Sequence, residues 1–104
     1  MTTPYEIRYL PVAEKDLVEI LDYIARDDPE VARRFVDRIE NGIGNLARLP
    51  KAGRRTRDAR LQRLGYRMLV LDEYLVFYVL IGRTVQIRRI LHGARRYDFL
   101  LPDR

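Results

Sequence analysis

The sequence has no cysteine and no serine, and its 104 residues include a single histidine, His92. The absence of cysteine excludes disulfides and thiolate metal sites, and it is typical of a protein from a reducing cytoplasm. Because serine is absent as well, nucleophilic triads built on Ser or Cys are impossible. The longest apolar runs have only strand length, and no zinc signature or phosphate-binding glycine loop is present. We therefore expect a soluble, cytoplasmic protein without a metal, a cofactor or a membrane segment.

Lysine is scarce too, since only Lys15 and Lys51 accompany 18 arginines. Residues 1–50 carry 7 Lys/Arg against 10 Asp/Glu, whereas residues 51–104 carry 13 against 5, within a formal net charge of +5. Guanidinium groups bind phosphate or carboxylate well, although the codon bias of a GC-rich genome explains the large number of arginines equally well. The placement predicts one basic face that binds anions or an acidic partner, with a purely solvated surface as the alternative. Its candidate arginines are Arg54, Arg55, Arg57, Arg60, Arg63, Arg67, Arg88, Arg89, Arg95 and Arg96.

Hydrophobic patterns predict a single domain over residues 1–104 with the element order β-α-α-β-β-β. Residues 5–10 form the first strand, and residues 12–27 form an amphipathic helix. Asp28-Pro29-Glu30 begins a second helix that ends near Leu49-Pro50, because Asp caps free N–H groups and Pro suits the first helical position. The short connection between them makes the two helices an antiparallel hairpin.

The second half of the chain predicts an antiparallel meander. Residues 51–60 form a basic connector without apolar periodicity, and residues 61–71 contain one or two short strands, of which the last six residues are the clearest. Residues 74–81 are a near-continuous apolar run, typical of a central strand. Gly82-Arg83 fits a type II′ hairpin turn, and residues 84–91 form the return strand. The predicted fold class is α+β, with the helical hairpin packed on a twisted antiparallel sheet.

Six short motifs follow one another over nearly the whole chain. They are Ala13-x-x-Asp16-Leu17-x-x-Ile20-x-x-Tyr23-Ile24, Ala32-x-x-Phe35, Leu49-Pro50-x-x-Gly53-Arg54, Leu64-Gly65-Tyr66-Arg67, Tyr74-Leu75-Val76-Phe77-Tyr78 and Ile90-Leu91-His92-Gly93-Ala94-Arg95-Arg96. In their order and spacing the chain resembles the RelE/ParE superfamily of toxins from bacterial type II toxin–antitoxin modules, which act in plasmid stabilisation.

The resemblance implies one of two activities. RelE-like members cleave mRNA in the ribosomal A site by metal-independent attack of the 2′-hydroxyl, whereas ParE-like members inhibit DNA gyrase. In both branches an antitoxin wraps the toxin in a hetero-oligomer, and the other end of the antitoxin usually binds operator DNA. Operator DNA is therefore expected as a partner only through the antitoxin.

Two leucines favour the ParE branch. The RelE nuclease pattern implies cations at alternating positions of the strand at 66–71, one directly after the tyrosine that opens the next strand, and another at the end of the last strand, where this chain has Arg95 or Arg96. Here Arg67 fills the first position, but the second is Leu69, and Leu75 follows Tyr74. Two lost cations, each worth roughly a hundredfold in rate, weaken the case for RNA cleavage. A gyrase inhibitor that is not an enzyme is the favoured reading; a ribosome-dependent ribonuclease is the alternative, and an inactive member that binds only antitoxin is a third.

The resemblance also suggests which residues carry function. We expect the target-binding set to be Arg67, His92, Arg95, Arg96 and Tyr97; in the ribonuclease alternative the same residues are catalytic, with His92 or Tyr97 as proton carrier. For His92, the other reading is a hydrogen-bonded residue that organises the strand end. The antitoxin is expected along the apolar edges left by hairpin and sheet. Its acidic residues would then meet the basic surface of Arg54, Arg55, Arg57, Arg60 and Arg88.

Overall fold

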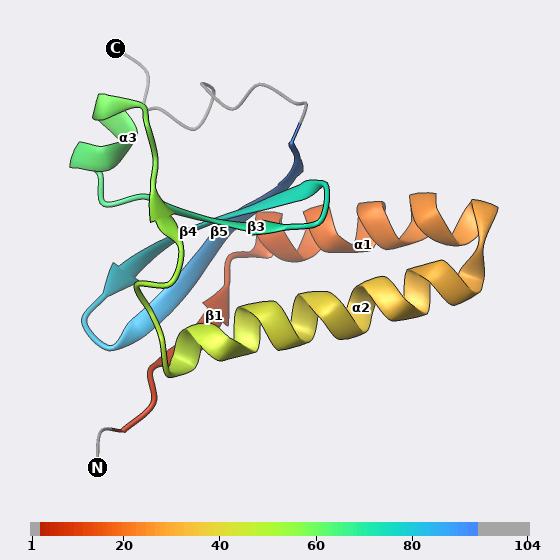
Figure 1. The fold of residues 1–104 in the computed structure, drawn as a ribbon, viewed down its shortest axis with the longest axis horizontal. Helices are drawn as coiled ribbons and strands as arrows, with labels where there is room; N and C mark the ends of the chain where they lie inside the picture. The colour runs from red at the N-terminus through yellow and green to blue at the C-terminus, as the bar shows by residue number, and fades with distance from the viewer. Residues whose placement is uncertain (1–2, 94–104) are drawn as a thin grey trace.

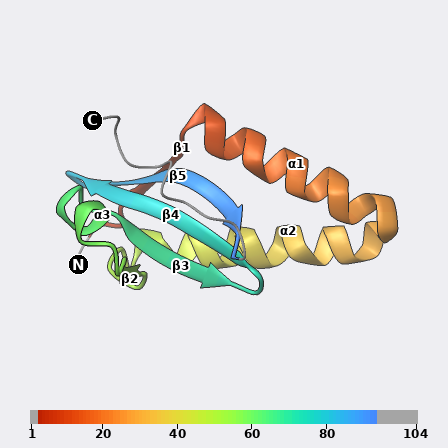
Figure 2. The same cartoon turned by 90° about the horizontal axis from the view of Figure 1, so that it is seen from above.

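The structure is a computed structural model in which residues 3–93 are described (Figure 1). Two long helices, α1 (Pro11–Asp27) and α2 (Pro29–Gly44), lie antiparallel and cover one face of a five-stranded sheet (Figures 1 and 2). The predicted α+β class with a helical hairpin packed on a sheet is therefore confirmed. The remaining elements are β1 (Glu6–Tyr9), η1 (Asn45–Ala47), β2 (Arg54–Arg55), α3 (Ala59–Arg63), β3 (Arg67–Leu71), β4 (Tyr74–Ile81) and β5 (Thr84–His92).

Local signals set the boundary between the two long helices. The Asp28 carboxylate accepts hydrogen bonds from the backbone N–H groups of Glu30 and Val31 at 3.0 and 3.3 Å. Pro29 occupies the first position of α2, where its missing N–H costs nothing. The predicted start of the second helix is thus confirmed, and α2 ends at Gly44 before η1 carries the chain towards the predicted end.

The strands follow the order β1-β5-β4-β3-β2. β3, β4 and β5 form the predicted antiparallel meander, and β2 adds a short antiparallel edge. The expectation of a wholly antiparallel sheet was wrong at the other edge, because β1 pairs in parallel with β5, with Ile7 opposite Val85. Parallel pairing requires a long connection, and the intervening elements provide it.

The basic connector is more ordered than its composition predicts. It contains β2, and residues 61–63, expected in a strand, belong to α3 instead. The Asp58 carboxylate caps α3 by accepting from the backbone N–H groups of Arg60 and Leu61 at 2.8 and 3.3 Å. Leu61 is fully buried beneath the sheet. Five helical residues with a single buried apolar side chain are too few to produce a helical period, so the pattern resembled a strand.

Hydrophobic residues fill both faces of β4, as expected for a central strand. Val76 and Tyr78 pack in the cluster beneath the helices, whereas Phe77 and Val79 pack with Leu61 in a second cluster on the opposite face. The strand therefore joins two cores.

Two backbone irregularities shape β5, one in the turn before it and one within it. Gly82 has a φ of +59°, whereas Arg83 does not have a positive φ, because Asp72 is the only non-glycine residue between 3 and 93 that does. A positive φ at the first turn residue alone is the pattern of the predicted type II′ turn. Ile87 lies opposite Tyr78 while Arg89 lies opposite Phe77, which leaves Arg88 as the extra residue of a β-bulge.

Candidate functional site

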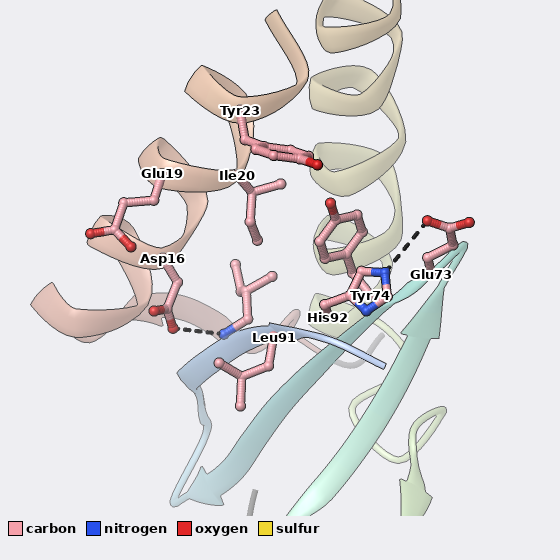
Figure 3. Close-up of a pocket in the computed structure, with 9 residues that line it drawn as sticks. Asp16, Glu19, Ile20, Tyr23, Glu73, Tyr74, Leu91 and His92 are labelled. Atoms are coloured by element: carbon pink, nitrogen blue, oxygen red, sulfur yellow. Dashed lines mark hydrogen bonds and ion pairs between the residues drawn. The ribbon is translucent and has the colours of Figure 1, made fainter. Parts of the chain in front are cut away.

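A cavity of about 410 Å³ lies between α1 and the ends of β4 and β5 (Figure 3). We call this cavity the hairpin groove. Successive turns of α1 supply one wall, and the last residues of β5 with the β3–β4 turn supply the other. A second cavity of about 370 Å³ adjoins it, because both are lined by Tyr23, Glu73 and Tyr74. The hairpin groove is lined by Asp16, Glu19, Ile20, Tyr23, Glu73, Tyr74, Ile90, Leu91 and His92.

A buried carboxylate fixes the geometry of this groove. Asp16 accepts hydrogen bonds from Arg89 Nε at 2.7 Å and Nη2 at 2.9 Å, and from the backbone N–H of Ile90 at 3.0 Å. β1 stops at Tyr9, opposite Ile87, so Asp16 reaches β5 just beyond the last pair of that ladder. The hydrogen bonds that Arg89 donates to the Asp16 carboxylate raise the pKa of Arg89, although burial of the guanidinium opposes this. Asp16 therefore connects α1 to the last residues of β5 before His92.

His92 closes β5 beside the β3–β4 turn. Its Nε2 atom lies 3.6 Å from the Glu73 carboxylate, and its ring meets Tyr74 edge-on with centroids 5.4 Å apart (Figure 3). The N–H of Gly93 donates to the carbonyl of Glu73 at 2.7 Å. Burial, with the nearby charge of Glu73 and then Tyr23, raises the pKa of Tyr74. These contacts fit the reading in which His92 organises the strand end; its contact with a target stays a prediction.

Arg67 lies elsewhere and holds a loop. Its Nη1 donates to the carbonyl of Gly53 at 2.9 Å. The buried Tyr78 hydroxyl donates to the carbonyl of Pro50 at 2.8 Å and accepts from the N–H of Gly53 at 2.9 Å. A Cβ atom at Gly53 would lie 2.6 Å from that hydroxyl oxygen, so the position requires glycine. Arg67 and Tyr78 thus explain the Leu49-Pro50-x-x-Gly53 motif as the anchor of the loop.

The two predicted target-binding residues that the structure describes, Arg67 and His92, lie at different places along the sheet. Arg67 pairs with Tyr78 and His92 pairs with Tyr74 on the same strand, so about 13 Å of β4 separates them at a rise of about 3.3 Å per residue. Arg95, Arg96 and Tyr97 lie outside the described residues.

Several of the candidate arginines are separated as well. Arg54 and Arg55 are consecutive on β2, so their side chains point to opposite sides of the sheet. Arg57 is exposed, Arg60 lies 3.7 Å from the Asp58 carboxylate, and Arg89 is engaged by Asp16. Within residues 3–93, strand alternation on β2 and the ion pair of Arg89 with Asp16 therefore separate several of the candidate arginines, and a shared anion- or antitoxin-binding surface of the others stays a prediction.

Arg88 is the most enclosed of the predicted basic-surface residues. Its guanidinium carbon lies 5.7 Å from the centre of the Tyr66 ring. Its Nε atom is buried and has no hydrogen-bond partner among residues 3–93. Its role towards an antitoxin or an anion stays a prediction.

Sequence reasoning overlooked the groove itself. Asp16, Ile20 and Tyr23 stand at helical spacing on one face of α1, and all three belong to a motif that carried the family resemblance. That spacing was the available signal. It gave no indication that Glu73 and His92 would meet them, because these come from a turn and a strand end far along the chain.

The described residues also limit other chemistry. Between residues 3 and 93 there is no group of three or more His, Cys, Asp or Glu side chains placed to hold a metal ion. None of the helices in that part of the chain combines the length and apolar character needed to cross a membrane.

Comparisons with known proteins point to one family. The family model described as "ParE toxin of type II toxin-antitoxin system, parDE" matches residues 7–97. The chain is 34% identical over 95 residues to a protein of Sinorhizobium fredii (strain NBRC 101917 / NGR234) named "Putative toxin Y4kP", covering 91% of this chain and 95% of that protein.

Solved structures agree with that match. The fold is similar to a chain of a structure described as the chromosomal ParDE TA system from P. aeruginosa, with a TM-score of 0.72, 25% identity and coverage of 88% of this chain and 98% of that one. It is also similar to a chain of the toxin–antitoxin complex RelBE2 from Mycobacterium tuberculosis, with a TM-score of 0.60, 26% identity and coverage of 86% and 98%.

Proposed function

The chain belongs to the family of ParE toxins of type II toxin–antitoxin systems, and we propose that it inhibits DNA gyrase and is held inactive by a cognate antitoxin. In this proposal the toxin is a binding protein rather than an enzyme, and it uses no cofactor. Its module would serve plasmid stabilisation, with operator DNA bound only by the antitoxin.

The contacts made by Leu69, Leu75 and Arg67 support a gyrase target over RNA cleavage. Leu69 packs against the core beneath the helices, and Leu75 packs against the cluster on the opposite face. Both positions implied as cationic for RelE-like cleavage thus serve hydrophobic packing. Arg67, at the third, donates to a loop carbonyl. Attack by a 2′-hydroxyl needs clustered cations to stabilise the phosphorane, and these three positions do not supply them.

An antitoxin partner is supported by two observations. The similar solved structures are described as a ParDE system and a RelBE2 toxin–antitoxin complex. On this chain, the Tyr23 side chain, which is 72% exposed, borders the hairpin groove, and Ile20 lines the groove beside it. Exposed apolar patches next to a groove are typical of protein interfaces.

The proposed target can be tested with purified toxin in two parallel assays. We expect loss of gyrase supercoiling activity and no cleavage of ribosome-bound mRNA. Cleavage of mRNA with unimpaired supercoiling would replace the proposal by the ribonuclease alternative. Inactivity in both assays, together with harmless overexpression, would favour an inactive member that only binds antitoxin.

Two variants separate target contact from folding. The proposed target-facing residues remain Arg67, His92, Arg95, Arg96 and Tyr97. Replacing Arg95 and Arg96 together by alanine should abolish gyrase inhibition at an unchanged Tm. Arg67→Ala should lower the Tm as well, because the loop carbonyl of Gly53 loses its donor. Full inhibition by the Arg95/Arg96 double variant would remove those two residues from the target-facing set.

A further inference from the structure

We propose that the hairpin groove receives a lysine or arginine side chain carried by an apolar segment of the antitoxin. This inference rests on the proposed neutralisation by an antitoxin and adds the chemistry of one contact. It adds a cationic contact to the expected apolar contacts and to the expected meeting of acidic antitoxin residues with the basic surface.

The lining of the groove has a charge opposite to that of the whole protein. The chain carries a net charge of +5, yet among residues 3–93 the groove is lined by three carboxylates and by neither lysine nor arginine. Asp16 is neutralised internally by Arg89. The carboxylates that remain are Glu19 on α1 and Glu73 on the β3–β4 turn; in Figure 3 the Glu19 side chain is directed away from Tyr74 and Glu73.

Both carboxylates are available to a partner. No Lys or Arg nitrogen between residues 3 and 93 lies within ion-pair distance of Glu19 or Glu73. Glu73 faces His92 at 3.6 Å, which is a charged pair only when the imidazole is protonated, and the Glu73 side chain is 79% exposed. An acidic group of the partner that entered the groove would be repelled by these carboxylates, whereas a cation would be attracted to them.

The walls and floor suit the rest of such a side chain. Ile20 on α1 and Ile90 on β5 supply apolar side chains for the methylene stem of lysine or arginine. Tyr23 and Tyr74 lie close enough for the charge of one to raise the pKa of the other, and their rings offer faces for a cation. An apolar floor, aromatic walls and acidic rims together select an amphipathic segment with one inserted cation.

The test uses the product of the open reading frame next to this gene as the antitoxin probe. Glu19→Gln and Glu73→Gln each remove one charge at nearly constant shape. We expect each to weaken binding by about tenfold, which corresponds to about 1.4 kcal/mol. Glu14→Gln is the matched control, because Glu14 is exposed on the opposite side of the same helix; it should leave the Kd unchanged.

A ring variant tests the aromatic wall separately. Tyr23→Phe keeps the π face and should bind like wild type, whereas Tyr23→Leu should weaken binding. Because Tyr23 is 72% exposed, neither change is expected to affect folding. Replacing the cations of the antitoxin by methionine, one at a time, should reveal one whose effect is not additive with Glu73→Gln.

The outcomes separate the two proposals. If the neighbouring gene product does not bind the wild-type toxin, the proposed antitoxin neutralisation fails. If it binds wild type tightly, and Glu19→Gln and Glu73→Gln bind as well as Glu14→Gln does, the groove does not receive a cation and only this inference is overturned. Tighter binding by the glutamine variants would show instead that an acidic or neutral segment occupies the groove.

Discussion

Asp16→Ala is expected to destabilise the fold more than the loss of any surface carboxylate of the described chain. The Asp16 side chain is 9% exposed, and that of its partner Arg89 is 18% exposed. The substitution removes the acceptor of both hydrogen bonds donated by the guanidinium and of the hydrogen bond donated by the Ile90 N–H at 3.0 Å. The guanidinium then stays largely buried without the carboxylate that balanced it.

The size of the effect follows from that burial. Breaking a buried ion pair by removing one partner costs about 3–5 kcal/mol. A domain of this size has about 5–15 kcal/mol of total stability, so Asp16→Ala would consume a large part of it. Urea denaturation should show a lower midpoint with little change in slope.

Two further variants make the Asp16 experiment decisive. Glu6→Ala breaks an exposed ion pair with Arg8 and should cost less than about 1 kcal/mol. Asp16→Ala combined with Arg89→Met leaves no unbalanced charge and should recover part of the loss. If Asp16→Ala costs no more than Glu6→Ala, the carboxylate does not hold α1 to β5 and the reasoning is refuted.

Other predictions concern the loop anchor and the buried tyrosines. Tyr78→Phe leaves the Pro50 carbonyl and the Gly53 N–H without their partner, at about 1–3 kcal/mol for each buried group; an unchanged urea midpoint would contradict this. Gly53→Ala places a Cβ 2.6 Å from the Tyr78 hydroxyl oxygen and 2.7 Å from the ring carbon Cε1, so it should destabilise both wild type and Tyr78→Phe, which denaturation of the two backgrounds measures. Burial raises the pKa of Tyr9, Tyr74 and Tyr78 above the ordinary 10.0, so their contribution to stability is full below that pH and is lost as the pH rises through the folded values. In an alkaline titration, unfolding measured by circular dichroism and tyrosine ionisation measured by tyrosinate absorbance should occur over the same pH range. Stability that does not fall above the ordinary tyrosine pKa would disprove this prediction.

Local patterns were sufficient for the main elements of the fold. The helix start at Asp28-Pro29 depends on side chains within three residues of one another, and the type II′ turn depends on Gly82. The apolar run of β4 directly reports burial on both faces. Such features are readable because each is decided within a few residues.

The groove depends on contacts that no local pattern contains. Asp16 meets Arg89 across 73 positions of the chain, and the parallel pairing of β1 with β5 decides where that contact falls. The sequence therefore emphasised the arginines, whose number is visible, rather than Glu19 and Glu73, whose proximity is created only by folding.

Leu69 and Leu75 pack in the two hydrophobic clusters, and Arg67 holds a loop, so the choice between gyrase inhibition and RNA cleavage is the central question. One measurement decides it. Purified toxin should be titrated into a gyrase supercoiling assay, with ribosome-bound mRNA in a parallel reaction. We predict that supercoiling is lost in proportion to toxin, that mRNA stays intact, and that the neighbouring gene product restores supercoiling. Cleaved mRNA beside fully active gyrase would contradict the proposed function.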